Sequence, residues 1–216
     1  MEEGAPRFFD LLSREGIPAT AFATGDVARR YPDQMARLVD AGHELGCHGD
    51  THRRFSTMTT SEAAAELDRS TETLRAFAPV TSFRAPNLDY PAALLPLLAE
   101  RGYTLDSSIA RYKPHKGHPS RPVREGGVLR VPASTMPSLV RLPGLVRPFV
   151  LGWLREPLVL FFHPWEFVDV TREPIPWDCR FRTGAPALAS LAAAIAYLRR
   201  RGDSFVLMRD LANSAA

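Results

Sequence analysis

Two histidines four residues apart, His48 and His52, are the residues of this sequence whose type and spacing point most directly to chemistry. They lie in a loop that directly follows a short predicted strand, 44–47. A catalytic zinc-class ion takes three imidazole or carboxylate groups from the protein and keeps a further position open for water or substrate. The spacing His-x-x-x-His is a weak signal alone, because it also arises by chance on loops and helix faces. The pair is therefore a candidate for two of three metal ligands.

Further polar residues stand at the ends of other predicted strands. Arg84, Asp106 and His163 each come at or directly after the end of a different strand. In an α/β barrel the carboxyl ends of the strands form the face at which catalytic loops gather. Because separate strands deliver these groups to one expected rim, together with His48 and His52, we predict that they form a metal-assisted catalytic site.

The elements that must position these residues alternate regularly between strand and helix. Strand patterns cover residues 19–24, 44–47, 81–84, 103–106, 128–131, 157–162 and 204–207, and helical patterns lie between most of them. The segment 157–162 is apolar on both faces, which is typical of a buried parallel strand. The polar segment 107–127 reads as a long loop. This order predicts an α/β fold of mainly parallel strands, either a sheet or a barrel, in a single domain over residues 1–216.

The composition favours a soluble protein that does not bind nucleic acid. The chain has 216 residues, 45% of them hydrophobic, and its 27 Lys and Arg exceed its 24 Asp and Glu by only three charges, which are dispersed along the sequence. No run of about 18 apolar residues predicts a transmembrane segment. The first residues do not resemble a signal peptide. We therefore expect a cytoplasmic protein as the chain stands, or an envelope-associated one if its N-terminus is truncated.

Several segments together resemble the polysaccharide deacetylases of carbohydrate esterase family 4, which share the chitooligosaccharide-deacetylase (NodB-like) homology domain. The motif segments are Ala41-Gly-His-Glu-Leu-Gly-Cys-His-Gly-Asp-Thr-His52, Phe83-Arg-Ala-Pro86, Leu105-Asp-Ser-Ser108 and Leu158-Val-Leu-Phe-Phe-His163, and Ile17-Pro-Ala-Thr-Ala-Phe22 is similar to the second strand of the family. Gly49 departs from the usual Ser or Thr. The continuation His163-Pro-Trp-Glu166 is similar to a branch that acts on bacterial cell-envelope or exported polysaccharides.

The resemblance implies a role for each matching residue on a distorted (β/α)7–8 barrel. His48 and His52 would bind a divalent metal, most often zinc, with cobalt, nickel or manganese as alternatives. His163 would be the general acid, and Asp106 would hold it in its working tautomer. Arg84 would orient or tune an acidic partner. The implied reaction is the hydrolytic removal of acetyl groups from N-acetylhexosamine units of a polysaccharide or oligosaccharide, with the metal polarising the acetyl carbonyl.

Two further residues are implied to contact the substrate. Pro86 belongs to the third motif segment, and Trp165 follows His163 closely. The indole of Trp165 either stacks on a sugar ring or belongs to the core or an interface. Glu166 is either a second acid or a salt-bridge partner, and its spacing does not separate the two. His115 and His118 lie in the expected basic loop. An exposed, mobile loop is favoured there over a site that binds a second metal or an anionic glycan.

One departure from the family bears on the whole site. The first motif of the family is an Asp-Asp pair at the end of its first strand, which supplies the catalytic base and the third metal ligand, and we expect it upstream of Met1. Either the chain is truncated or it is a shortened homologue. Truncation is slightly favoured, because a barrel without this strand has unpaired edges, which an oligomer would have to cover. Asp50 either approaches the metal or, more in keeping with a loop position, bonds its own backbone.

Two alternatives to the deacetylase therefore stay open. One is a catalytically incomplete homologue that binds glycan or a partner subunit. The other is a hydrolase that opens the C–N bond of a small amide.

Overall fold

A computed structural model describes residues 2–113 and 119–214 of the chain. The chain divides into two compact units: a helical unit, formed by Met1–Ile17 and Ser134–Phe205, and a sheet unit, formed by Pro18–Ala133 and Val206–Ala216. The prediction of a single domain over residues 1–216 stays a prediction. His115 and His118 lie outside the described residues. None of the described helices has both the length and the apolar composition needed to cross a bilayer.

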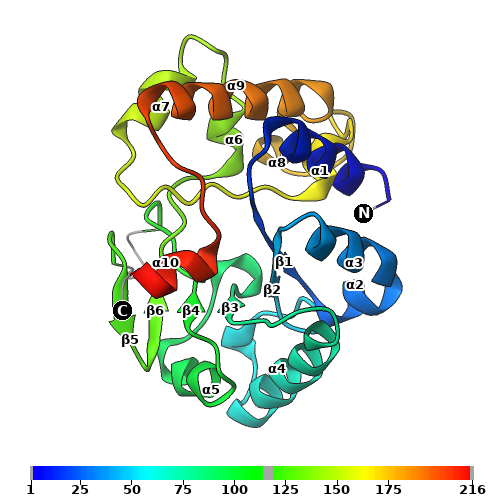
Figure 1. Cartoon of the computed structure of the whole chain (residues 1–216), viewed down its shortest axis with the longest axis vertical. Coiled ribbons are helices and arrows are strands. Elements are labelled where there is room, and N and C mark those ends of the chain that lie inside the picture. Colours follow the sequence, from blue (N-terminus) through cyan, green and yellow to red (C-terminus); the bar gives the residue numbers. More distant parts are fainter. Residues whose placement is uncertain (1, 114–118, 215–216) are drawn as a thin grey trace. The chain divides into compact units, whose positions relative to one another are not determined.

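The sheet unit contains six strands in the order β1-β2-β3-β4-β6-β5 (Figure 1). Their bounds are Thr20–Ala23, Glu44–Cys47, Ser82–Phe83, Leu105–Asp106, Val123–Glu125 for β5 and Val128–Arg130 for β6. All neighbouring pairs are parallel except β5 and β6, which form an antiparallel pair. The predicted α/β class with mainly parallel strands is confirmed. The described strands form an open sheet with β1 and β5 at its edges, however, and the sheet does not close into a barrel.

The centre of the sheet is tightly packed around β2. All four residues of β2 are buried, as expected for a strand with a neighbour on each side and helices over the sheet. Gly46 lies in β2 opposite Phe22 of β1, and a Cβ atom at this position would stand 2.7 Å from Cδ1 of the Phe22 ring. The absence of a side chain at Gly46 therefore allows the β1–β2 pair to form with this register.

Among the described residues, five α-helices belong to the sheet unit. They are α2 (Gly25–Arg30), α3 (Pro32–Asp40), α4 (Thr60–Arg75), α5 (Leu95–Glu100) and α10 (Met208–Ser214). Helix α4 begins with a capping box, in which Thr59 and Glu62 bond each other's backbone. Thr24, the residue before α2, caps this helix: its hydroxyl accepts the bond from Val27 N at 3.2 Å, because its extended backbone aims the hydroxyl at the first turn.

The helical unit contains α1 (Gly4–Glu15), α6 (Pro137–Val140), α7 (Arg147–Trp153), the 3₁₀ turn η5 (Pro164–Phe167), α8 (Trp177–Arg180) and α9 (Ala185–Arg201). The core is formed by α1, η5 and one face of α9. Leu11 and Phe167 pack there against Ala187, Leu191 and Ile195. The spacing of the last three residues places them on one helix face.

Two predicted strands are absent, and one unpredicted strand is present. Residues 157–162 and 204–207 are not strands, whereas β5 forms within the segment 107–127 that we expected to be a loop. Phe162 and Leu160 instead pack against apolar side chains of the helical unit, and the backbone of Val159 bonds Ser134. A short apolar segment can bury its side chains without pairing with another strand. Its composition alone therefore does not distinguish a strand from an extended core segment.

Candidate functional site

His48 and His52 lie side by side in the loop after β2. Their ring centroids are 5.1 Å apart, at an angle of 67°. The Nδ1 atom of His48 lies 2.5 Å from the carbonyl oxygen of Arg84. A carbonyl only accepts, so His48 carries its proton on Nδ1 and presents the lone pair of Nε2. Metal-ligating histidines typically have such a bond on the other ring nitrogen, which fixes the tautomer and orients the ring.

The loop that holds the pair has an unusual backbone. Gly49 has φ +77° and His52 has φ +61°, both in the left-handed region. Glycine adopts this region readily, but a histidine there costs on the order of 1 kcal/mol and is retained where the surroundings determine the conformation. The position of the His52 ring therefore depends on contacts elsewhere in the loop.

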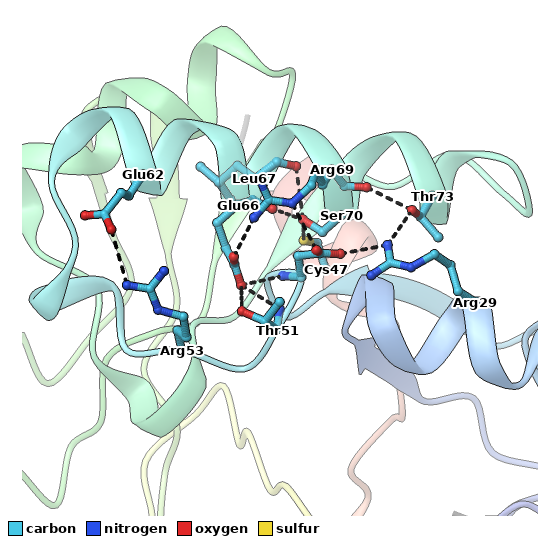
Figure 2. A network of polar contacts seen from close by, with 11 residues as sticks. Arg29, Cys47, Thr51, Arg53, Glu62, Glu66, Leu67, Arg69, Ser70 and Thr73 are labelled. Atoms are coloured by element: carbon cyan, nitrogen blue, oxygen red, sulfur yellow. Dashed lines mark hydrogen bonds and ion pairs between the residues drawn. The ribbon is translucent and has the colours of Figure 1, made fainter.

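Glu66 of α4 supplies those contacts (Figure 2). A single carboxylate oxygen, Oε1, accepts hydrogen bonds from Asp50 N at 3.0 Å, Thr51 N at 2.6 Å and Thr51 Oγ1 at 2.8 Å. The other oxygen pairs with Arg69 at 3.1 Å. Glu66 is almost fully buried, so these bonds form away from competing water. We name this arrangement, from Glu66 to the backbone of residues 50 and 51, the Glu66 clamp.

Asp50 is not the exposed loop residue, bonding its own backbone, that the sequence favoured. The side chain is only 4% exposed and forms ion pairs with Arg29 at 2.8 Å and with Arg69 at 3.1 Å. It is therefore a buried ionic anchor of the loop rather than an exposed residue bonding its own backbone. Both of its oxygens face guanidinium groups, which leaves them badly placed to serve as metal ligands.

The donor set fits a divalent metal in part. Two imidazoles at this separation suit a zinc-class ion, and the tautomer of His48 suits a ligand. Within residues 2–113 and 119–214, no group of three or more His, Cys, Asp or Glu side chains is arranged to hold a metal ion. The described side chains therefore account for two donors of the expected three.

Arg84 and Asp106 are buried in the sheet unit. Arg84 donates to the carbonyl and the hydroxyl of Ser107 at 3.2 and 2.8 Å, and burial lowers the pKa of its guanidinium to about 10. Asp106 accepts from Arg130 Nε at 3.0 Å and from Ser108 N at 2.9 Å. Burial raises the pKa of Asp106 although Arg130 opposes the shift. The role of Asp106 toward His163 stays a prediction.

His163 precedes η5 in the helical unit. Its Nδ1 lies 3.1 Å from Oε1 of Glu166, and the indole of Trp165 stacks on its ring at 5.4 Å between centroids and 18° between planes. The side chain of His163 is 45% exposed, whereas that of Glu166 is 1% exposed. Trp165 thus supports the imidazole from one face, and its predicted contact with substrate stays a prediction.

Pro86 is buried at the start of the 3₁₀ turn η2 (Pro86–Leu88), beside Ala85, whose N–H donates to Ser108 Oγ at 2.7 Å. The two residues after Pro86, Asn87 and Leu88, have φ of +60° and +52°. The turn is therefore a second segment with a conformation that its surroundings must fix. The substrate contact predicted for Pro86 stays a prediction.

Sequence reasoning missed the residues that support the site. Glu66 had a readable signal: it lies on the face of α4 that also buries Ala63, Leu67, Ser70 and Leu74, where a lone carboxylate requires a partner. Arg141, which pairs with Glu166 across 3.5 Å, had no such signal, because the apolar stretch 139–154 contains two prolines and gives no clear helical face.

Known proteins resemble the first half of the chain in sequence. The family model described as polysaccharide deacetylase matches residues 1–105. A peptidoglycan deacetylase of Helicobacter pylori is 33% identical over 111 residues, which are 50% of this chain and 38% of that protein. The chain thus matches well under half the length of such relatives, and only 26% of a Bacillus subtilis peptidoglycan-N-acetylmuramic acid deacetylase.

Solved structures share the fold over nearly the whole chain. A family 4 carbohydrate esterase from Streptomyces lividans matches with a TM-score of 0.63 and 17% identity, covering 95% of this chain and 84% of that one. A family 4 pseudoenzyme from Bacillus anthracis matches with a TM-score of 0.67 and 15% identity, covering 97% and 60%. Residues 1–105 are thus similar to the polysaccharide deacetylases, and the fold of the chain is similar to that of carbohydrate esterases of family 4.

Proposed function

We propose that the chain acts as a metal-dependent deacetylase on N-acetylhexosamine units of a cell-envelope or exported polysaccharide. The observation that carries the metal part is the geometry of His48 and His52, with the Nδ1 proton of His48 engaged by the Arg84 carbonyl. The substrate class is supported by the family match and by relatives named as peptidoglycan and chitooligosaccharide deacetylases.

In this proposal each residue has a defined task. His48 and His52 would hold a divalent ion, zinc or else cobalt, nickel or manganese, which would act as a Lewis acid toward the acetyl carbonyl. Water adds to that carbonyl, the C–N bond breaks, and acetate leaves. His163, as the imidazolium, gives its Nε2 proton to the departing amine nitrogen, so that the sugar is released as a free amine, and the neutral imidazole that remains takes up the proton that the attacking water gives up.

The proposal also predicts how firmly the metal is held. Catalytic zinc sites usually have three protein donors, and two imidazoles bind correspondingly less tightly. We therefore expect metal that is retained in a rapid desalting step but is lost on extended dialysis. A third donor from elsewhere would show itself as retention through dialysis.

The test combines elemental analysis with an assay for released acetate. The purified chain is loaded with zinc, desalted and compared with His48→Gln/His52→Gln and with His163→Gln, which is the matched control. We expect about one ion per chain in the parent and in His163→Gln, and none in the double variant. Acetate release from chitooligosaccharides or peptidoglycan should be fastest in the parent, about 10²–10⁴-fold slower but measurable in His163→Gln, and absent in the double variant. Equal metal content in all three proteins would overturn the assignment of the ligands.

A second function is favoured by the two-donor geometry: a homologue that binds glycan without hydrolysing it. The described side chains supply two metal donors, and one protein of similar fold is described as a pseudoenzyme. Such a protein would bind chitooligosaccharides in calorimetry without releasing acetate from them. Glycan binding by a metal-loaded protein that releases no acetate would therefore select this function over the first.

A further inference from the structure

Glu166 bonds both the backbone and the ring of His163. The same carboxylate oxygen, Oε1, accepts from the backbone N–H of His163 at 2.8 Å and lies 3.1 Å from Nδ1 of its ring. An ionised carboxylate only accepts, so the Nδ1 atom of His163 is the donor. This places the proton of the neutral imidazole on Nδ1, and Nε2 becomes the nitrogen available to a substrate.

A buried cation stands behind Glu166. The second oxygen, Oε2, lies 3.5 Å from Nε of Arg141, and the two side chains are 1% and 2% exposed. The guanidinium is itself held by the carbonyls of Asp178 and Cys179, at 2.7 and 3.0 Å. A buried carboxylate without a compensating charge would be strongly unfavourable, so Arg141 allows Glu166 to stay buried and charged beside the imidazole.

The backbone on both sides of Glu166 is fixed as well. Its N–H donates to the His163 carbonyl at 2.9 Å, and its own carbonyl accepts from Gly184 at 2.8 Å. The next residue, Phe167, belongs to the core of the helical unit. Neither the carboxylate nor the imidazole is therefore free to swing, and only the exposed edge of His163 faces outward.

We infer that Glu166 is the positioning residue of His163, holding its ring in the Nδ1–H tautomer, with Arg141 fixing the carboxylate in turn. This assigns to Glu166 the task that the family resemblance gave to Asp106. The inference rests on the proposed function only in taking His163 as the general acid. The tautomer itself is a property of the helical unit and is measured without any substrate.

A purely structural role must be separated from positioning, because Glu166 also bonds the backbone at the start of η5. Glu62 offers a matched control: it bonds the backbone of Thr59 in the same way, and its side chain pairs with Arg53. The variants are Glu166→Gln and Glu62→Gln, together with His163→Gln and the double variant Glu166→Gln/His163→Gln.

The first readout is the ¹⁵N spectrum of histidine-labelled protein, with the signal of His163 assigned by its loss in His163→Gln. We expect the Nδ1–H tautomer in the parent and in Glu62→Gln, and a mixture of tautomers in Glu166→Gln. An Nε2–H tautomer in the parent would overturn the inference by itself, even if no Glu166 variant folds.

The second readout is kinetic. Loss of a positioning partner typically lowers activity about 10- to 100-fold. We expect that loss in kcat of Glu166→Gln, with KM unchanged, and no further loss when the change is added to His163→Gln. Additive losses in the double variant would show a structural role and would refute positioning. A parent that releases no acetate but has the Nδ1–H tautomer would refute the proposed function while leaving the inference intact.

Discussion

Replacing Glu66 by Ala should loosen the histidine loop and weaken metal binding together. The change removes the acceptor of the N–H groups of Asp50 and Thr51 and of the Thr51 hydroxyl. A buried donor left without an acceptor costs about 1–3 kcal/mol, and the amide of Asp50 is the more deeply buried of the two. Counting about 2 kcal/mol for this amide and about 1 kcal/mol for the groups of Thr51, we expect a loss of about 3 kcal/mol in unfolding free energy.

Metal affinity should fall when the histidine loop loosens. Without the Glu66 clamp, the left-handed conformation of His52 is no longer fixed, and the two rings sample separations other than 5.1 Å. Contacts that orient metal ligands are typically worth 10- to 100-fold in affinity, so we expect zinc or cobalt to bind weaker by about that factor. Urea unfolding of the metal-free protein measures the unfolding free energy, and calorimetric titration measures the metal affinity.

The control is Glu72→Ala, which removes a carboxylate from an exposed position of the same helix, α4. It should change the unfolding free energy by less than about 0.5 kcal/mol and leave metal affinity unchanged. Amide hydrogen exchange at residues 50 and 51 provides a readout that needs no metal, and it should speed up in Glu66→Ala alone. A variant that loses stability yet binds metal as the parent does would refute the idea that Glu66 positions the histidines.

Three further predictions concern the scaffold and are measured by urea unfolding. Thr59→Ala should cost about 1 kcal/mol, because it removes the side-chain cap of α4. Gly46→Ala should cost about 1–3 kcal/mol, since its Cβ would stand 2.7 Å from the Phe22 ring, and Phe22→Leu should recover part of the loss. Asp68→Asn should cost about 0.5 kcal/mol at neutral pH, as expected for a largely exposed ion pair.

The prediction for Asp68 has a defined dependence on pH. The hydrogen bond from Arg101 lowers the pKa of Asp68 below its usual 3.8 in the folded protein. A lowered carboxyl pKa contributes stability above the unfolded value and loses it as the pH falls through the folded value. The difference between parent and Asp68→Asn should therefore vanish at strongly acid pH. A difference that persists there would contradict the ion-pair explanation. The control for the cap is Ser61→Ala, which removes another hydroxyl from the first turn of α4, and a loss as large as that of Thr59→Ala would contradict the capping explanation. A failed rescue by Phe22→Leu would contradict the packing explanation at Gly46.

Local signals in the sequence predicted the sheet unit well. A short apolar segment between the end of a helix and two histidines predicts β2 and the loop of His48 and His52. The capping-box sequence predicts the start of α4. These features depend on neighbours within a few residues. The α/β class follows in turn from the alternation of such elements along the chain.

Features that depend on distant partners could not be predicted. The segment 157–162 has the composition of a buried strand, but its fate depends on which apolar surfaces the rest of the chain offers it. The carboxylates of Asp50 and Glu166 pair with Arg69 and Arg141, which lie on other elements. The spacing of residues in the sequence does not predict these pairs. Ion pairs between distant residues follow from packing, which sequence periodicity does not record.

The helical unit combines two segments that lie far apart in the sequence, Met1–Ile17 and Ser134–Phe205. The ribosome therefore synthesises its two parts at different times. In the finished unit Glu15 meets Arg199, which follows it by 184 residues. At a synthesis rate of about 5–20 residues per second, α1 leaves the ribosome roughly 10–40 s before its partner helix α9. The apolar side chains of Leu11 and Leu12 are without their final neighbours during that interval. The nascent chain should therefore be most exposed to chaperone binding and to proteases at its first helix, after the strands of the sheet unit have already emerged.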